Sequence, residues 1–183
     1  MNERKLFLGI PLSPKSKTRI VQSVAKWGDL PVFAERPENL HVTVLFLGFV
    51  TDEHAVWIAE IAADICSEHE PFDLTFRTAV TVPDVGPVKI IHLVGDESEP
   101  LLRLQNALEC ELLGKKAEGK CFRPHVTLAR VKRHEFASLS PDRLPIFPQD
   151  ISISEPVMSV VLYESIGNGA KKQYLQMDEF PLG

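Results

Sequence analysis

Apolar and polar residues follow one another along this chain in patterns that predict strands and helices in turn. The apolar run KLFLGIPL (5–12) predicts a first strand. Ser13 followed by Pro14 predicts the N-cap and first position of a helix that Gly28 ends. A second strand is predicted over residues 41–47, ended by Gly48. A helix capped by Thr51 or Asp52 then carries an apolar stripe at helical spacing, made of Ala55, Ile58, Ala59, Ala62, Ile65 and Cys66.

The second half of the chain has a similar order of patterns. Residues 72–80 alternate with period two and, with IIHLV (90–94), predict a hairpin. Ser98 predicts the cap of a helix that Gly114 closes, and another strand begins at His125. Residues 133–149 are rich in proline and predict irregular structure. ISISEPVMSVVLYESI and KKQYLQMDEF predict further strands joined at residues 167–169.

Strand, helix and strand therefore recur in the same order, which predicts an α+β protein built from two similar lobes. Each lobe has an antiparallel sheet plus helices, and each contributes one strand to a central cleft with pseudo-twofold symmetry. A chain of 183 residues with 44% hydrophobic content can bury one substantial core, so we expect residues 1–183 to form a single two-lobed domain.

A repeated motif strengthens the idea of duplication. NLHVTVLFLG (39–48) and FRPHVTLARV (122–131) both contain His-Val-Thr before an aliphatic residue. Residues i and i+2 of a strand share a face, so each stretch predicts a His/Thr pair above an apolar underside. The two histidines, His41 and His125, lie 84 residues apart (125 − 41), close to half the chain.

The alternative for any one of these histidines is a packed residue that bonds to the backbone, and this is the commoner case for a single histidine. Six His and seven Thr in 183 positions give roughly 0.2 His-x-Thr pairs by chance. The sequence has two, both at strand-like positions, which favours a functional pair.

Composition narrows the class of protein. A formal charge of −5 excludes bulk positive charge as a means of coating nucleic acid, although Lys120, Arg123, Arg130, Lys132 and Arg133 gather around the second motif. Three cysteines without a Cys-x-x-Cys pattern suggest buried reduced thiols, not disulfides or a zinc site. No apolar run is long enough to span a bilayer, and no signal peptide is recognised, so we expect a cytoplasmic protein. The sequence carries no signal for an oligomeric state, so a monomer is the default expectation.

Two histidines suit general acid–base chemistry on a phosphate. Histidine titrates near pH ~6.5, so a neutral and a protonated imidazole can coexist in one site near physiological pH. Opening a 2′,3′-cyclic phosphate requires a base that activates water and an acid that protonates the departing ribose oxygen. The threonine hydroxyls would hold the non-bridging phosphate oxygens.

These residues resemble the two-histidine phosphoesterases, and within them the RNA 2′,3′-cyclic phosphodiesterases, also called 2′-5′ RNA ligases. The likeness runs from LFLGIPL through RPENLHVTVLFLG and FRPHVTLAR to LYESIGNGAKKQY. It implies a bilobal LigT-like fold, an RNA substrate ending in a 2′,3′-cyclic phosphate, a 2′-phosphomonoester product, and no cofactor or metal. It also implies possible ATP-independent 2′-5′ ligation by the same site. Half-tRNAs and small cyclic nucleotides carry the same reactive group, and the sequence does not choose among them.

The resemblance also implies roles for individual residues. His41 would donate a proton to the leaving 3′ oxygen, His125 would activate water, and Thr43 and Thr127 would bind the phosphate. Arg130 matches a family position that approaches the substrate. Strict alternation places Arg130 on the face opposite His125, so a bulge or the strand's end must turn it.

Several alternatives stay open. Phe46, Phe49 and Phe122 lie beside the motifs, where core packing is favoured over stacking on a base. GKKAEGK (114–120) fits part of a phosphate-binding loop but lies between a helix and a strand in the wrong order.

A metal hydrolase would need further ligands beside the motifs, whereas His54, His69, His92 and His134 are interpreted as surface or packing residues. A protein that binds RNA ends or cyclic nucleotides without turnover is the third possibility.

Overall fold

The computed structural model describes residues 3–114, 122–139, 147–167 and 172–183. The first half contains β1 (Glu3–Pro11), α1 (Pro14–Ala25), β2 (Val32–Ala34), the short 3₁₀ helix η1 (Pro37–Asn39), β3 (His41–Thr51) and α2 (Asp52–Ser67). The second half contains β4 (Phe72–Val82), β5 (Ile90–Gly95), α3 (Glu99–Leu113), β6 (His125–Val131), α4 (Arg133–Ala137), β7 (Gln149–Val157), β8 (Ser159–Ile166) and β9 (Gln173–Pro181). The predicted α+β class is confirmed.

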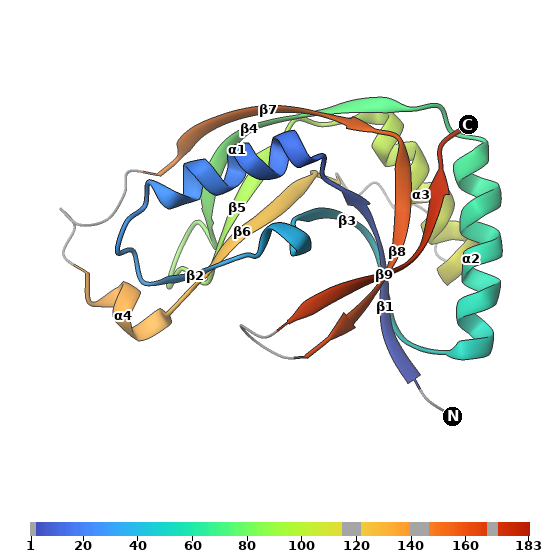
Figure 1. The fold of residues 1–183 in the computed structure, drawn as a ribbon, viewed down its shortest axis with the longest axis horizontal. Helices are drawn as coiled ribbons and strands as arrows, with labels where there is room; N and C mark the ends of the chain where they lie inside the picture. Colours follow the sequence, from blue (N-terminus) through green and yellow to red (C-terminus); the bar gives the residue numbers. More distant parts are fainter. Residues whose placement is uncertain (1–2, 115–121, 140–146, 168–171) are drawn as a thin grey trace.

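In the described residues, nine strands form one curled sheet in the order β7-β4-β5-β6-β3-β1-β8-β9, with β2 paired to β6 (Figure 1). Along this path β7, β4, β5 and β6 lie on one side of the junction between β6 and β3, and β3, β1, β8 and β9 lie on the other. The two predicted lobes are therefore half-sheets of one continuous sheet. They join at a single registered pair, Val42 opposite Val126.

The helices begin where the capping residues predict. The side chains of Ser13, Thr51 and Ser98 accept backbone N–H bonds at the starts of α1, α2 and α3. Gly114 closes α3 with a φ of 61°. Both α2 and α3 lie side by side against the sheet, where Ile58, Ala62, Leu104 and Leu108 are buried in the main core. These helices cover the face of the sheet that lies opposite the motif histidines.

Two strand predictions need correction. Gly48 does not end the strand that begins at His41: β3 continues to Thr51, because Gly48 adopts a φ of 80° beside a bulge and the chain then resumes its pairing with β1. The loop expected through Pro31 contains β2, which pairs with β6. β8 and β9 pair antiparallel, and most of the turn predicted at 167–169 lies outside the described residues, because 168–171 are not among them.

Other sequence-based interpretations can be checked against this fold. Cys66 is buried, and its burial raises the pKa of the thiol to about 12, whereas Cys110 is exposed, contrary to expectation. Cys121 and nearly all of GKKAEGK lie outside the described residues. In the parts of the chain that the structure describes, no helix combines the length and apolar character needed to cross a bilayer.

Candidate active site

Both motif histidines lie on strands at the centre of the sheet, β3 and β6, and their side chains occupy the same face. Val42 and Val126 are fully buried underneath, whereas His41, Thr43, His125 and Thr127 are half-buried. Because the strands are antiparallel, the Val42–Val126 register brings His41 alongside Thr127 and Thr43 alongside His125. The four polar side chains therefore form a compact group across the strand junction.

Arg130 reaches this face through a bulge. On β5, Ile91 pairs with Ala129 and the next residue, His92, pairs with Thr127, so Leu128 is an extra residue in β6. The extra residue reverses the alternation, and Leu128 and Ala129 are both buried while Arg130 is not. The bulge therefore brings Arg130 to the face of β6 that carries His125, where strict alternation would not have placed it.

A cavity of about 440 Å³ connects these residues. That volume suits a nucleotide-sized ligand. All five sequence-predicted site residues line it, namely His41, Thr43, His125, Thr127 and Arg130. Its wall also includes residues that the sequence did not single out for the site: Lys5, Phe7, Glu35, Asn39, His92, Lys172 and Tyr174.

The ring of His41 is held by its backbone bond and by aromatic neighbours. Its Nδ1 lies 2.6 Å from the carbonyl oxygen of Asn39 and must donate, because a carbonyl only accepts. Its Nε2 lies 3.0 Å from the hydroxyl of Thr43. The rings of Phe7, Tyr163 and Tyr174 surround it at centroid distances of 4.9, 5.7 and 4.9 Å. The arrangement fixes the tautomer and leaves Nε2 as the nitrogen that can exchange a proton.

Asn39 is a buried residue that connects this corner of the site to the β8–β9 hairpin. Its side-chain amide donates to the carboxylate of Glu35 at 2.8 Å and to the backbone carbonyl of Lys172 at 2.9 Å. Its side-chain oxygen accepts from the backbone N–H of Tyr174 at 3.2 Å. These bonds hold in place the Asn39 backbone carbonyl, which accepts the hydrogen bond from Nδ1 of His41, and they place Lys172 and Tyr174 beside the cavity.

His125 has a matching backbone bond but a different neighbour. Its Nδ1 donates to the carbonyl of Arg123 at 3.1 Å, which again leaves Nε2 for proton exchange. Its ring stacks on that of His92, with centroids 4.5 Å apart and planes inclined by 22°. His92 was interpreted from sequence as a surface or packing residue, and instead it lines the cavity. The sequence signal that could have identified His92 is the strand IIHLV, whose alternation sets His92 apart on one face of β5.

Two imidazoles in the site are poised as neutral groups. The pKa of His41 is lowered to about 4, first because its ring is buried and then because Lys172 and His125 lie nearby, while the bond to Asn39 acts in the opposite direction. The pKa of His92 is also lowered to about 4, by burial and by the positive charge of His125 and Arg130. Both rings favour the uncharged form at neutral pH.

These shifts predict a loss of stability on acidification. Between pH 6.5 and 4 the unfolded chain binds protons at both imidazoles that the folded chain does not bind, so the free energy of unfolding falls as pH falls. We expect roughly 1 to 2 kcal/mol per histidine on going from pH 7 to 5. Urea unfolding at both pH values measures it. His92→Phe keeps a ring and should remove about half of this difference; an undiminished difference would contradict the assignment.

The remaining candidates separate clearly. Phe122 packs against the main core, as favoured, whereas Phe46 and Phe49 are each 70% exposed, so core packing is the wrong interpretation for both. Of the basic cluster, Lys132 lies over Phe33 and pairs with Glu135, outside the cavity wall. Among the described residues, no three His, Cys, Asp or Glu side chains gather as a metal-binding group.

Known proteins are similar to this chain in sequence and in fold. A family model described as the 2′-5′ RNA ligase superfamily matches residues 14–165. An Archaeoglobus fulgidus protein named RNA 2′,3′-cyclic phosphodiesterase is 36% identical over 104 residues, which are 56% of this chain and 57% of that protein. A protein of the same name from Aquifex aeolicus is 25% identical over 98% of this chain and 97% of its own length.

The fold agrees with a solved structure. The crystal structure of E. coli LigT complexed with 3′-AMP superposes with a TM-score of 0.77 at 25% identity, covering 99% of each chain. The bilobal LigT-like architecture predicted from sequence is thereby confirmed. Because the family model spans most of the chain, the chain belongs to the 2′-5′ RNA ligase superfamily.

Proposed function

We propose that this protein hydrolyses the 2′,3′-cyclic phosphate at the end of an RNA chain and leaves a 2′-phosphomonoester. The observation that carries the proposal is the compact group of two imidazoles and two hydroxyls on one face of the β3–β6 junction. Each imidazole bonds a backbone carbonyl through Nδ1, which leaves Nε2 for the reaction. Relatives named RNA 2′,3′-cyclic phosphodiesterase and membership of the superfamily support it.

The proposed reaction moves two protons. The Nε2 atom of His125 removes a proton from water, and the water oxygen attacks phosphorus. The bond from phosphorus to the 3′ oxygen breaks, and His41 gives its Nε2 proton to that oxygen, which becomes a 3′ hydroxyl. Each general acid or base of this kind contributes roughly 10² to 10⁴ in rate. The order of the two roles follows the family resemblance.

His41 must acquire its proton before it can act as the acid. In the free protein its Nε2 accepts from the Thr43 hydroxyl, and its pKa of about 4 keeps the ring neutral. A phosphate anion between the two histidines offsets the positive charge of Lys172 and therefore raises this pKa. Once Nε2 is protonated, the Thr43 hydroxyl hydrogen is released to bond a phosphate oxygen.

The other cavity residues fit the rest of the substrate. Thr43 and Thr127 would bind the non-bridging oxygens, and the guanidinium of Arg130 would neutralise the charge that develops on them. Phe46, exposed at the cavity wall, offers a face on which the terminal base can stack. If a 5′ hydroxyl takes the place of water, the same groups would join it to the cyclic phosphate through a 2′-5′ bond without ATP: His125 takes the hydroxyl proton, the bond from phosphorus to the 3′ oxygen breaks, and His41 protonates that oxygen.

One assay tests the function. A short RNA ending in 2′,3′-cyclic phosphate is incubated with the protein in buffer containing EDTA, and the ends are mapped with a phosphatase. We expect a 2′-phosphate end. Activity that disappears with EDTA and returns with zinc would favour a metal hydrolase, and tight binding without any product would favour a non-catalytic RNA-end protein. The cytoplasmic location, the monomeric state and the single domain stay predictions.

A further inference from the structure

A row of side chains leads from the catalytic histidine toward the outer end of β3. On β1 and β3, Gly9 pairs with Thr43, Phe7 with Phe46 and Lys5 with Phe49. Two register shifts, at Val44 and Leu47, each insert one extra residue into β3. Because of these shifts, Phe46 and Phe49 share the face of His41 and Thr43, although simple alternation would divide them between the two faces.

The outer members of this row are exposed and chemically suited to nucleic acid. Phe46 and Phe49 are each 70% exposed, in a protein whose other large apolar side chains on β3 are mostly buried. The ammonium group of Lys5 lies 5.9 Å from the centroid of the Phe49 ring. A solvated aromatic face beside a cation is the combination with which proteins bind single-stranded nucleic acid, by base stacking and phosphate attraction.

The row is continuous with the active-site cavity. Lys5, Phe7 and Phe46 line the cavity wall together with His41, and Phe49 stands next to Lys5 across the strand pair. Moving outward from the phosphate position, the row therefore offers His41 and Thr43, then Phe46, then Phe49. Positions of one face repeat about every 7 Å along a strand, a spacing that an extended single strand of RNA can follow with one base per ring.

We propose that Phe49 and Lys5 form a binding subsite for the nucleotide that precedes the cyclic phosphate end, so that the enzyme prefers an RNA chain over a cyclic mononucleotide. The inference rests on the proposed function. The base of the preceding nucleotide stacks on Phe49, and Lys5 contacts the phosphate that links it to the terminal nucleotide. The substrate class is then single-stranded RNA with at least two nucleotides.

A second exposed pair of the same kind provides an internal comparison. Phe33 on β2 is 48% exposed, lies 5.3 Å from the Lys132 ammonium group and pairs across strands with Arg130. It flanks the opposite end of the site. We favour Phe49 because Lys5 belongs to the cavity wall, whereas Lys132 does not line it.

The test compares kcat/KM for 2′,3′-cyclic AMP and for an adenosine dinucleotide with the same cyclic end. We expect Phe49→Ala to lower the dinucleotide value by about 5- to 100-fold, the effect of losing one base stack, and to leave the mononucleotide value unchanged. Phe49→Trp should restore the dinucleotide value, and Phe49→Leu should not. Trp57→Ala removes a partly exposed aromatic ring from α2 and serves as the matched control.

The outcomes separate this inference from the proposed function. If the wild type cleaves both substrates and Phe49→Ala changes neither, or lowers both equally, the subsite is wrong while the cyclic phosphodiesterase stands. If Phe33→Ala produces the selective loss instead, the bound RNA chain extends from the active site past Phe33 and not past Phe49, and the proposal is overturned. If the wild type cleaves neither substrate, the proposed function itself fails.

Discussion

Replacing either His41 or His125 with alanine should lower turnover of a cyclic phosphate end at least ~100-fold while leaving RNA binding largely intact. The two rings line one cavity and each presents Nε2 to it, so each substitution removes one of the two proton transfers. A loss of that size corresponds to about 3 kcal/mol of barrier. Single-turnover cleavage and filter binding of the same RNA measure the two effects separately.

The control for this experiment is His54→Ala, which removes an exposed histidine of α2 whose ring lies against Trp57, and which should cleave at the wild-type rate. The double variant His41→Ala/His125→Ala should be little worse than the single variants, because the residues act as a unit. Wild-type cleavage by both single variants would refute the proposed roles. Loss of binding equal to the loss of turnover would assign the histidines to binding instead.

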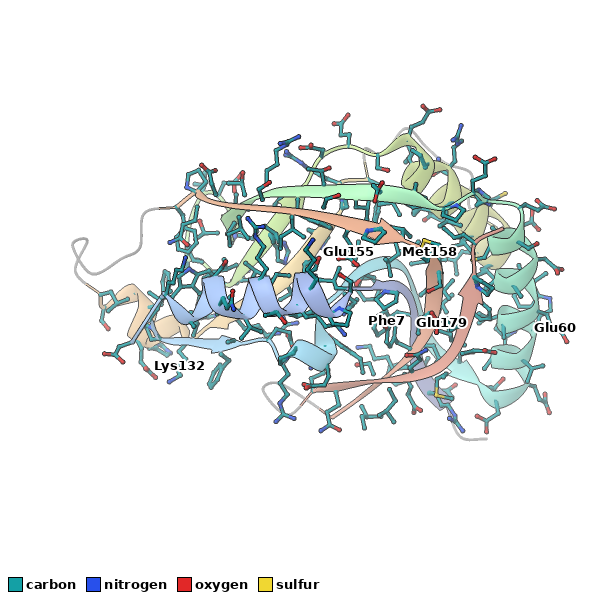
Figure 2. The ribbon with its side chains drawn as sticks, turned by 45° about the horizontal axis from the view of Figure 1, so that its top comes forward. Phe7, Glu60, Lys132, Glu155, Met158 and Glu179 are labelled. Carbon is teal, nitrogen blue, oxygen red and sulfur yellow. The ribbon has the colours of Figure 1, made fainter. Side chains whose placement is uncertain are left out.

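Glu155→Ala should lower the free energy of unfolding by about 2 to 4 kcal/mol, the largest stability effect we expect. Glu155 is 1% exposed, and it lies on β7 close to the start of α1 (Figure 2). Its carboxylate accepts from the backbone N–H of Ser13 at 2.6 Å and from the Ser13 hydroxyl at 3.0 Å. Without it, both donors are left unpaired in a poorly hydrated place.

Urea unfolding measures this effect through the midpoint, provided that the slope is unchanged. Ser13→Ala removes the helix cap and the hydroxyl bond to Glu155 but keeps the bond from the Ser13 backbone N–H, and it should cost about 1 kcal/mol. Glu155→Gln keeps one acceptor oxygen for the N–H and should fall between the two. If Glu155→Ala is as stable as Ser13→Ala or more stable, the bond from the Ser13 backbone N–H to Glu155 contributes nothing of its own, and the expected effect is wrong.

The regular elements of this fold are readable from sequence because capping residues and periodicity act locally. Ser13, Thr51 and Ser98 cap the predicted helices, and His41 and His125 begin the predicted strands. The duplicated His-x-Thr pattern also places four site residues on one face, since period two holds over the few residues involved.

The bulges could not be located from sequence, and they decide the rest of the site. The extra residue at Leu128 turns Arg130 toward His125, and those at Val44 and Leu47 expose Phe46 and Phe49 on the catalytic face. Alternation alone assigns Arg130 and Phe46 to the wrong face, and it places Phe49 correctly only because the two shifts in β3 cancel. The cavity residues from distant segments, such as Lys172 and Asn39, depend on long-range pairing that local patterns do not encode.

The positions opposite the two threonines differ in a way that has a chemical consequence. Gly9 stands opposite Thr43, where an added Cβ would lie 3.3 Å from a ring carbon of His41, whereas His92 stands opposite Thr127 and covers the ring of His125. Backbone symmetry alone would admit the ribose either way round and yield a mixture of isomeric monoesters. Because the packing beside the two imidazoles is unequal, we expect one ribose orientation and therefore one isomeric monoester to predominate.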